Sequence, residues 1–317
     1  MLKRIFCGIL IFNSLLFSQG VIVSGYTAPA PVSVAPGQIA TFYVQVPNGA
    51  SANIIGITLQ QGSTNTNVPL KSVRTISQCP NNAGTSQPPC PSLLAVTVQI
   101  PYELVPYCPL CARPVSATPP MLIINQGGQA PAVIELNPLA DQVHVLTTCD
   151  VVLGAVPQPN YTGLPCAPLV THLDGTLVSA SAPANFGEAV TAWVFGLGQT
   201  NPAASTGEPA KMAAAAQTFN LNFNYALNAL ATKPIQTSPD RILIHPLYAG
   251  LAPGYVGLYQ VNFTIPPGPQ NGIAHCALPG SFAQGSNVPQ SNLTVSIGGQ
   301  FSFDGAGICV NTQIPVD

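Results

Sequence analysis

The sequence predicts an all-β protein built from β-sandwiches, and two observations lead to this prediction. Apolar and polar residues alternate with a period of two in short runs rich in Val, Ile, Thr, Phe and Tyr, which fit a pleated surface with one buried face. Turn residues separate the runs, as at Pro47-Asn48-Gly49, Asp174-Gly175, Gly298-Gly299 and Asp304-Gly305. Many short strands favour sandwiches over a closed barrel.

Strands are expected where this alternation is clearest. These runs are residues 38–46, 53–60, 93–100, 121–125, 132–136, 188–196, 218–225, 241–245, 258–265 and 293–297. One segment favours helix, "AKMAAAAQ" at 210–217. It is too short to be a stable helix alone, so we expect a single surface turn of helix or a linker there.

Three pairs of segments match in the same order along the chain. "APGQIATFYVQV" (35–46) aligns without gaps on "NFGEAVTAWVFG" (185–196), "VTVQIP" (96–101) on "VNFTIP" (261–266), and "MLIINQGGQ" (121–129) on "LTVSIGGQ" (293–300). This order predicts two copies of one β module. We therefore expect a signal peptide at 1–20, a first β-sandwich domain at 21–147, a disulfide-closed linker at 148–170 and a second β-sandwich domain at 171–317.

Composition and the N-terminus predict an exported protein that does not bind nucleic acid. Only 6% of residues are charged and the net charge is −2, so no basic patch is available for nucleic acid. Residues 1–20 have a basic start, an apolar stretch and a small-residue end, the layout of a signal peptide. A membrane anchor is the alternative, but the apolar run is short of the about 20 residues that a span needs. No later stretch predicts a transmembrane segment.

Cysteine usage agrees with export. Cys7 lies in the signal peptide, and the remaining cysteines are even in number, which in an exported chain predicts disulfides. Zinc binding by the CxxC at Cys108 and Cys111 is the alternative, but no second pair or histidine pair accompanies it. From their positions along the chain we expect four bonds: Cys79–Cys90, Cys108–Cys111, Cys149–Cys166 and Cys276–Cys309.

The C-terminal part resembles a known family. The segments that carry the resemblance are "SAPANFGEAVTAWVFGLGQTNPAASTGEPA" (181–210), "YAGLAPGYVGLYQVNFTIPPG" (248–268) and the late "VSIGG" (295–299). They are similar to the Solibacter-type uncharacterised C-terminal domain family of exported bacterial proteins. The resemblance implies immunoglobulin-like sandwiches and export, and it implies no reaction. The cysteine-bearing insertions at 79–90, 107–111 and 276–290 depart from the family pattern.

No catalytic or metal-binding motif stands out. The chain has no GxSxG, HExxH or paired-carboxylate motif. A triad that joins His172, Asp174 and a distant serine stays open, although the "THLDGT" hairpin explains both residues better. Calcium binding at Asp174 or Asp304 is weaker still, because each is a single acid in a turn. We therefore expect no enzyme activity and no cofactor.

Aromatic residues supply the remaining candidates for a ligand site. Tyr43, Trp193, Tyr248, Tyr255 and Tyr259 could each stack on a sugar ring. Trp193 aligns with Tyr43 in the middle of a strand, which favours core packing of both. Tyr248 and Tyr255 flank the glycine-rich loop at 250–257 and form a possible ligand platform, with core packing as the alternative. The glycines match neither a phosphate loop nor a dinucleotide motif, so we interpret the loop as a turn before a strand.

Together these observations predict a secreted, extracellular or cell-surface protein without enzyme activity that acts in adhesion or assembly. Its expected partners are other extracellular or cell-surface proteins, or a second copy of itself. A carbohydrate-binding module is the alternative, with glycans as partners.

Overall fold

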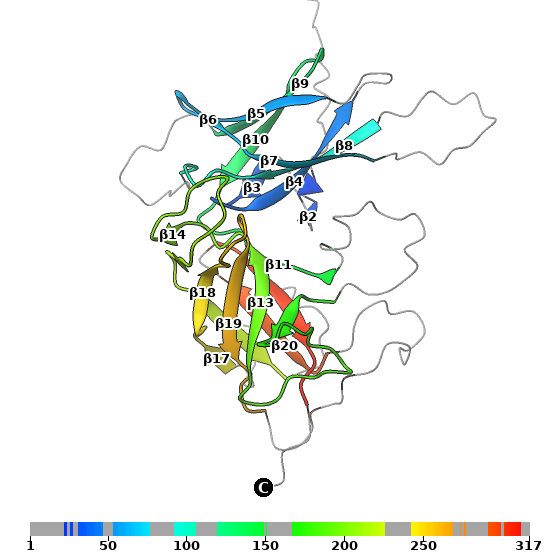
Figure 1. Ribbon diagram of the computed structural model, residues 1–317, viewed down its shortest axis with the longest axis vertical. Helices are drawn as coiled ribbons and strands as arrows, with labels where there is room; N and C mark the ends of the chain where they lie inside the picture. The colour runs from blue at the N-terminus through cyan, green and yellow to red at the C-terminus, as the bar shows by residue number, and fades with distance from the viewer. Residues whose placement is uncertain are drawn as a thin grey trace, which may run out of the picture.

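The computed structural model describes residues 22–23, 26–27, 31–46, 53–76, 92–105, 119–148, 150, 167–225, 242–268, 273, 276, 291–298 and 301–311. Nearly all of its elements are β-strands (Figure 1), which confirms the predicted all-β class. Each of the ten predicted runs contains a strand. Within this part of the chain, no helix reaches the length and hydrophobicity that crossing a bilayer requires.

The N-terminal part, residues 31–140, contains a five-stranded and a three-stranded sheet. The first sheet has the order β3-β10-β9-β5-β6 and the second β4-β8-β7. Neighbouring strands are antiparallel, except that β3 runs parallel to β10. The bounds are β3 (Val32–Val34), β4 (Ile39–Val46), β5 (Ile54–Gln61), β6 (Thr64–Asn67), β7 (Leu70–Ile76), β8 (Ser92–Gln99), β9 (Met121–Gln126) and β10 (Ala132–Pro138). A short pair, β1 (Ile22–Val23) with β2 (Tyr26–Thr27), precedes them.

The C-terminal part, residues 141–311, also contains two sheets. One has the order β11-β13-β19-β18-β15-β14, with β12 also paired to β13, and the other β17-β16-β20-β21. An isolated parallel bridge joins Ala184 to Val310, just after β21. The bounds are β11 (His144–Val145), β12 (Val170–His172), β13 (Ala189–Phe195), β14 (Thr200–Asn201), β15 (Ala214–Ala215), β16 (Asn220–Asn224), β17 (Ile242–Ile244), β18 (Tyr248–Leu251), β19 (Tyr259–Thr264), β20 (Leu293–Gly298) and β21 (Phe303–Ile308).

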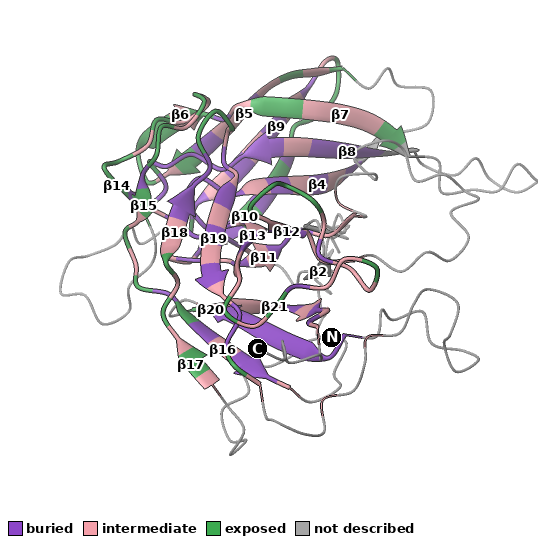
Figure 2. Ribbon diagram, turned by 60° about the horizontal axis from the view of Figure 1, so that its bottom comes forward, coloured by how far each residue is buried: buried purple, intermediate pink, exposed green. Residues whose placement is uncertain are grey.

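Each part has its own apolar core (Figure 2). In β9 and β19, buried residues alternate with partly exposed ones, so one face of each sheet turns inward. One buried cluster is drawn from residues between Val32 and Leu136, the other from residues between Val143 and Val310. By residue number, β11 falls in the predicted first domain, but it pairs with β13 and packs in the second cluster.

Three local predictions were wrong. Of the two alternatives for residues 210–217, the helical turn was wrong: the segment is irregular apart from β15, which pairs with β14 and β18. Asp304 and Gly305 lie inside β21 rather than at a turn. Tyr43 and Trp193 are only half-buried and lie on the outward positions of their strands, because Phe42, Val44, Ala192 and Val194 occupy the inward ones.

Several other predictions fall on positions outside the described residues. These are the signal peptide at 1–20, most of the linker at 148–170, and the bonds expected among Cys79, Cys90, Cys108, Cys111, Cys149 and Cys166.

Candidate functional site

The two tyrosines of the predicted ligand platform have different surroundings. The Tyr248 hydroxyl lies 3.0 Å from the Ala213 carbonyl oxygen and 3.2 Å from that of Leu251. A Cβ on Gly250 would lie 2.5 Å from this hydroxyl, so the ring occupies space that the glycine leaves open. Tyr255, in contrast, is 58% exposed. Tyr255 alone therefore presents a largely free ring.

Tyr259 and Tyr102 meet where the two parts of the chain join. Tyr259 is fully buried in the C-terminal core, and its hydroxyl donates to the Gly198 carbonyl oxygen. Its proton is then committed, so the Tyr102 hydroxyl donates to the Tyr259 oxygen, 3.2 Å away. The Tyr102 ring lies over Gly37, where a Cβ would come within 2.2 Å of a ring carbon. Burial raises the pKa of both tyrosines, so both hydroxyls stay protonated donors at neutral pH.

A segment of the C-terminal part, residues 196–219 between β13 and β16, reaches across this junction, which we call the seam (Figure 1). The Thr206 hydroxyl oxygen accepts the Tyr102 backbone N–H at 2.9 Å and donates to the Glu103 carboxylate at 2.6 Å. The Gly207 N–H donates to the side-chain oxygen of Gln99 at 2.7 Å, and the Gln199 amide donates to the Tyr102 carbonyl. Hydrogen bonds, most of them part-buried, thus join the two parts, and one of them is accepted by the exposed Glu103 carboxylate.

A cavity of about 470 Å³ opens at the seam. Tyr102 is the lining residue that comes from the N-terminal part. The rest of its lining comes from Pro202, Ala203, Ala204, Ser205, Glu208, Pro209, Ala210, Lys211, Ala213, Leu251 and Gly257. Ala210 also pairs with the loop that holds Tyr255, through bonds of 2.8 Å from its N–H to the Tyr255 carbonyl and from the Gly254 N–H to its own carbonyl. The exposed tyrosine therefore lies beside the cavity.

His144 lies between two carboxylates from different segments. Its Nδ1 is 3.2 Å from Asp304 Oδ2, and its Nε2 is 3.3 Å from Asp150 Oδ2. The same Asp304 oxygen accepts the Val145 N–H, and the same Asp150 oxygen accepts the N–H and the hydroxyl of Thr147. Because each ring nitrogen faces a carboxylate, both carry a proton, and the ring is an imidazolium.

The pKa of His144 agrees with this geometry. Burial disfavours the charged ring and lowers its pKa, but the hydrogen bonds and charges of Asp150 and Asp304 outweigh burial and raise it to about 9. Although burial opposes it, the pKa of Asp150 is lowered by the hydrogen bond and charge of His144 and by Thr147. The cluster joins β11 in one sheet to β21 in the other, so it closes one side of the C-terminal sandwich.

His172 lies in a shallow surface depression lined also by Leu173, Asp174, Thr176, Asn185, Phe186, Gly187 and Glu188. Its Nδ1 forms a short hydrogen bond with Glu188, and its Nε2 lies 3.1 Å from the Ala182 carbonyl oxygen. Burial lowers the His172 pKa, but these acceptors, with Glu188 first, raise it overall. Both nitrogens are engaged, so neither is free to take a proton from a nucleophile.

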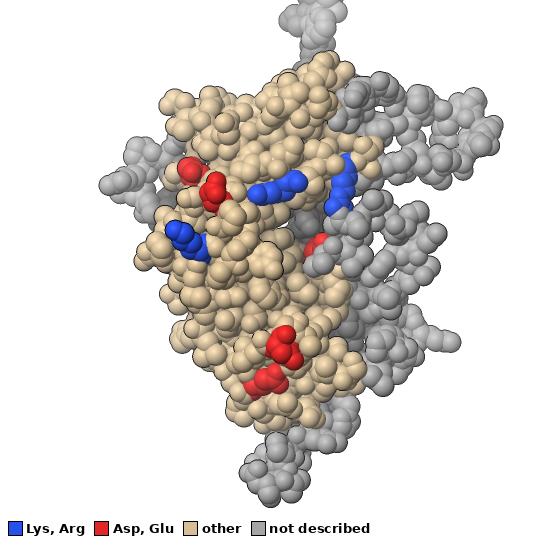
Figure 3. Space-filling view, viewed as in Figure 1, with Lys and Arg blue, Asp and Glu red and all other residues tan. Residues whose placement is uncertain are grey.

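The triad and calcium alternatives find no support among the described residues. Asp174 accepts bonds from the N–H and hydroxyl of Thr176 within the predicted hairpin, not from His172, and Ser179 bonds the Ala182 backbone. The described part of the chain holds no group of three or more His, Cys, Asp or Glu side chains arranged to hold a metal. Figure 3 shows how sparse charged side chains are on the face it presents.

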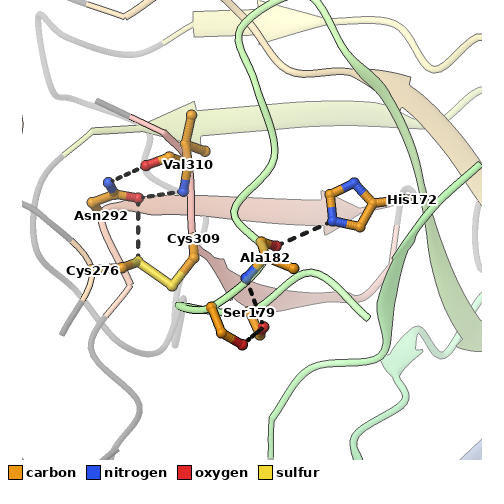
Figure 4. Close-up of a disulfide and its surroundings, with 8 residues drawn as sticks. His172, Ser179, Ala182, Cys276, Asn292, Cys309 and Val310 are labelled. Carbon is orange, nitrogen blue, oxygen red and sulfur yellow. Dashed lines mark hydrogen bonds between the residues drawn. A yellow bond between two sulfur atoms is a disulfide. The ribbon is translucent and has the colours of Figure 1, made fainter. Parts of the chain in front are cut away.

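The Cys276–Cys309 disulfide is present, as predicted (Figure 4). The two Cα atoms are 5.6 Å apart, within the usual range for a disulfide. The neighbouring Asn292 side chain accepts the Val310 N–H at 2.8 Å and donates to the Val310 carbonyl at 2.7 Å. The bond and the amide together fix the end of the last strand.

Sequence reasoning missed the seam and the His144 cluster. Tyr102 and Tyr259 are separated by 157 residues, and His144 and Asp304 by 160, so no local spacing marks either pair. One signal was present: Gly37, Gly198 and Gly257 stand close in sequence to residues that pack across the seam.

The comparisons with known proteins identify no family. No family model matches the sequence, and no curated protein matches it. Similar solved structures include pullulanase from Anoxybacillus sp. LM18-11, alone and complexed with maltotriose, each at 9% identity and a TM-score of 0.20. The alignments cover 89% and 94% of this chain and 28% and 29% of the pullulanase chains, so the chain spans under a third of their length. Likeness at this level supports no conclusion about fold or activity.

Proposed function

We propose that the protein is an exported, non-enzymatic interaction protein of the extracellular space or cell surface, built from two tandem immunoglobulin-like sandwiches. The strand order supports the modules. In the N-terminal part, β3, the first strand of the five-stranded sheet along the chain, runs parallel to β10, the last along the chain. The other sheet is β4-β8-β7. This is the immunoglobulin arrangement of a GFC sheet with an added edge strand, facing a BED sheet.

The C-terminal part contains seven strands in the same order, with β11, β12, β14 and β15 added to the sheet that holds β13, β19 and β18. The strands β4 to β10 correspond in turn to β13, β16, β17, β18, β19, β20 and β21, and the Ala184–Val310 bridge takes the place of the β3–β10 pair. The three segment pairs that align in sequence fall on corresponding strands, β4 with β13, β8 with β19 and β9 with β20. This supports two copies of one module.

The seam is the observation that carries the proposed function. Domains joined only by a linker move relative to each other by default. Here Tyr102 and Gln99 of the first module bond Tyr259, Thr206 and Gly207 of the second. A Cβ on Gly257 would lie 2.7 Å from the Gly37 carbonyl oxygen, so the two backbones approach closely. These contacts favour a fixed arrangement of the two modules, which would present surfaces to a partner at a constant spacing.

The use of charge also supports a non-enzymatic role. Asp141, Asp150, Asp304 and Glu188 each accept hydrogen bonds from backbone N–H groups. Carboxylates committed in this way fix loops and are not held ready for proton transfer. The Cys276–Cys309 bond supports an oxidising compartment, and so does the signal-like N-terminus.

Cross-linking on intact cells that produce the protein tests this proposal. We expect adducts with a defined cell-surface or extracellular protein, or with a second copy, identified by mass spectrometry. Gly257→Ala, which separates the backbones at the seam, should reduce the adducts, and Gly254→Ala, where a Cβ meets no atom within 4 Å, serves as the matched control. Turnover of an ester, glycoside or peptide by the purified protein would contradict the non-enzymatic role.

A carbohydrate-binding module is the second candidate function, and the exposed Tyr255 favours it. An exposed aromatic face beside a cavity offers a sugar ring an apolar surface. A glycan array with the purified protein tests it. Binding should be lost in Tyr255→Ala and retained in Tyr255→Phe, which keeps the ring. Equal loss in both variants would show that stacking is not the contact.

A further inference from the structure

The seam cavity holds two charged side chains that have no partner within the described part of the chain. Glu208 and Lys211 both line it, and neither forms a hydrogen bond or ion pair there. This contrasts with Asp141, Asp174 and Glu188, whose carboxylates are bonded within the protein. Both side chains are exposed, and the exposed Lys71 and Glu135 also lack a partner among the described residues. The position of Glu208 and Lys211 at the cavity, with opposite charges, therefore makes them candidates for contact with a ligand.

The rest of the cavity is preorganised. Thr206 and Gly207, which precede Glu208, are anchored on the N-terminal part, and Ala210, which precedes Lys211, is paired with the Tyr255 loop. The backbone of the segment that carries both charges is thus fixed before any ligand arrives, so binding requires no ordering of this backbone. The volume of the cavity, about 470 Å³, falls within the range of small-molecule sites.

The lining defines the chemistry of the ligand. A carboxylate accepts hydrogen bonds and an ammonium donates them, so a ligand with several hydroxyl groups satisfies both. The two charges sum to zero, and a ligand with net charge would face a like charge at one of them. The proline and alanine side chains and the Tyr102 ring provide apolar walls. A neutral sugar has these properties, because it has hydroxyl groups at its rim and apolar C–H faces.

We propose that the seam cavity binds one neutral sugar residue, with Glu208 accepting and Lys211 donating hydrogen bonds to its hydroxyls and Tyr255 contacting the next residue of the glycan. This inference rests on the carbohydrate-binding candidate function and adds its subsite. It also places the sugar against both modules, because Tyr102 comes from the first.

Isothermal titration of the purified protein with glucose, galactose, mannose, N-acetylglucosamine and their disaccharides tests the proposal. For the sugar that binds best, we expect the double variant Glu208→Gln, Lys211→Met to weaken binding tenfold or more without changing the melting temperature. The matched control is Glu135→Gln with Lys71→Met, which alters two charges that also lack a partner among the described residues, lie away from the cavity and should leave affinity unchanged. Glucuronate and glucosamine should bind more weakly than their neutral counterparts.

Three results would overturn the assignment, and they differ in what else they affect. If Tyr255→Ala abolishes sugar binding and the Glu208/Lys211 variant does not, the cavity is not the subsite and the carbohydrate function stands. If glucuronate or glucosamine binds best, the argument from charge is wrong. If no sugar or glycan binds, both the subsite and the carbohydrate function fail, and the interaction role is unaffected.

Discussion

Two turns, at residues 35–38 and 185–188, occupy equivalent places in the two parts of the chain and share the same backbone. The glycine of each has a positive φ, 76° and 77°, and donates its N–H at 2.9 Å to the strand end at Ile100 or Ile265. In each turn, the side chain of the fourth residue accepts a hydrogen bond from the backbone N–H of the first. Gln38 accepts from Ala35 at 2.9 Å, and Glu188 accepts from Asn185 at 2.8 Å. The two turns thus share one backbone conformation and one hydrogen-bond pattern.

The side chains around the two turns differ, and that difference builds the seam. A Cβ on Gly37 would meet the Tyr102 ring, whereas a Cβ on Gly187 would meet no atom within 4 Å. The residue after the strand-ending proline is Tyr102 in one part and Pro267 in the other. Tyr102 therefore covers the N-terminal turn and joins it to the seam, whereas the C-terminal turn has no such residue.

Alanine at the two glycines should separate these roles and give the largest effect. Each substitution places a Cβ at positive φ, which costs about 1–2 kcal/mol. Gly37→Ala also displaces the buried Tyr102 ring, so we expect a total loss of about 4–6 kcal/mol. Chemical denaturation of Gly37→Ala and Gly187→Ala measures the difference. Equal losses would show that Tyr102 does not stabilise the turn.

Removal of the Cys276–Cys309 bond should weaken the C-terminal module specifically. Its ends are 33 residues apart, so the chain-entropy model gives about 3–4 kcal/mol. In Cys276→Ser, Cys309→Ser we expect hydrogen exchange to rise first in β20 and β21, with β8 and β9 still protected. A uniform rise across both modules would mean that they unfold as one cooperative unit.

Alkaline pH should open the side of the C-terminal sandwich that His144 closes. The folded pKa, about 9, lies above the ordinary value of 6.5, so this stabilisation is complete below pH 6.5 and is lost as pH rises through 9. The shift corresponds to a loss on the order of 3 kcal/mol. Urea unfolding between pH 6 and 10 measures it. His144→Gln should flatten the curve, and His245→Gln, at an exposed position, should leave it unchanged.

The strands could be predicted from the sequence because a half-buried strand is a local pattern. Each of the ten alternating runs contains a strand, whereas β7 and β21 were missed among the strands of six or more residues. The sequence of β21 is "FDGAGI", in which an acidic residue and two glycines are typical of a turn. Asp304 is tolerated in that strand because its carboxylate faces the imidazolium of His144 and the Val145 N–H. Only the tertiary partner explains the residue.

The candidate site was only partly predictable for the same reason. Tyr255 was identified from its place beside glycines, and it is exposed. Tyr248 has the same local setting, but its hydroxyl is committed to Ala213, which lies 35 residues earlier. The cavity depends on Tyr102 meeting the 196–219 segment, and no pattern within either segment encodes that meeting.

The smallest expected effect comes from Glu188→Gln, which gives the C-terminal turn the side chain that the N-terminal turn has at Gln38. The amide oxygen can still accept the Asn185 N–H, so only the charge pairing with His172 is lost. Both side chains are partly exposed, at 16% and 24%, so we expect a cost of about 0.5–1 kcal/mol.

The folded pKa of His172 is raised and that of Glu188 is lowered. The cost should therefore be largest between their ordinary values, near pH 5.5, and should shrink as pH rises through the His172 pKa or falls through that of Glu188. Urea unfolding across this range measures the cost. In a double-mutant cycle, His172→Gln should add little once Glu188 is Gln; additive losses would show that the two side chains act independently and that charge is not what distinguishes the two turns.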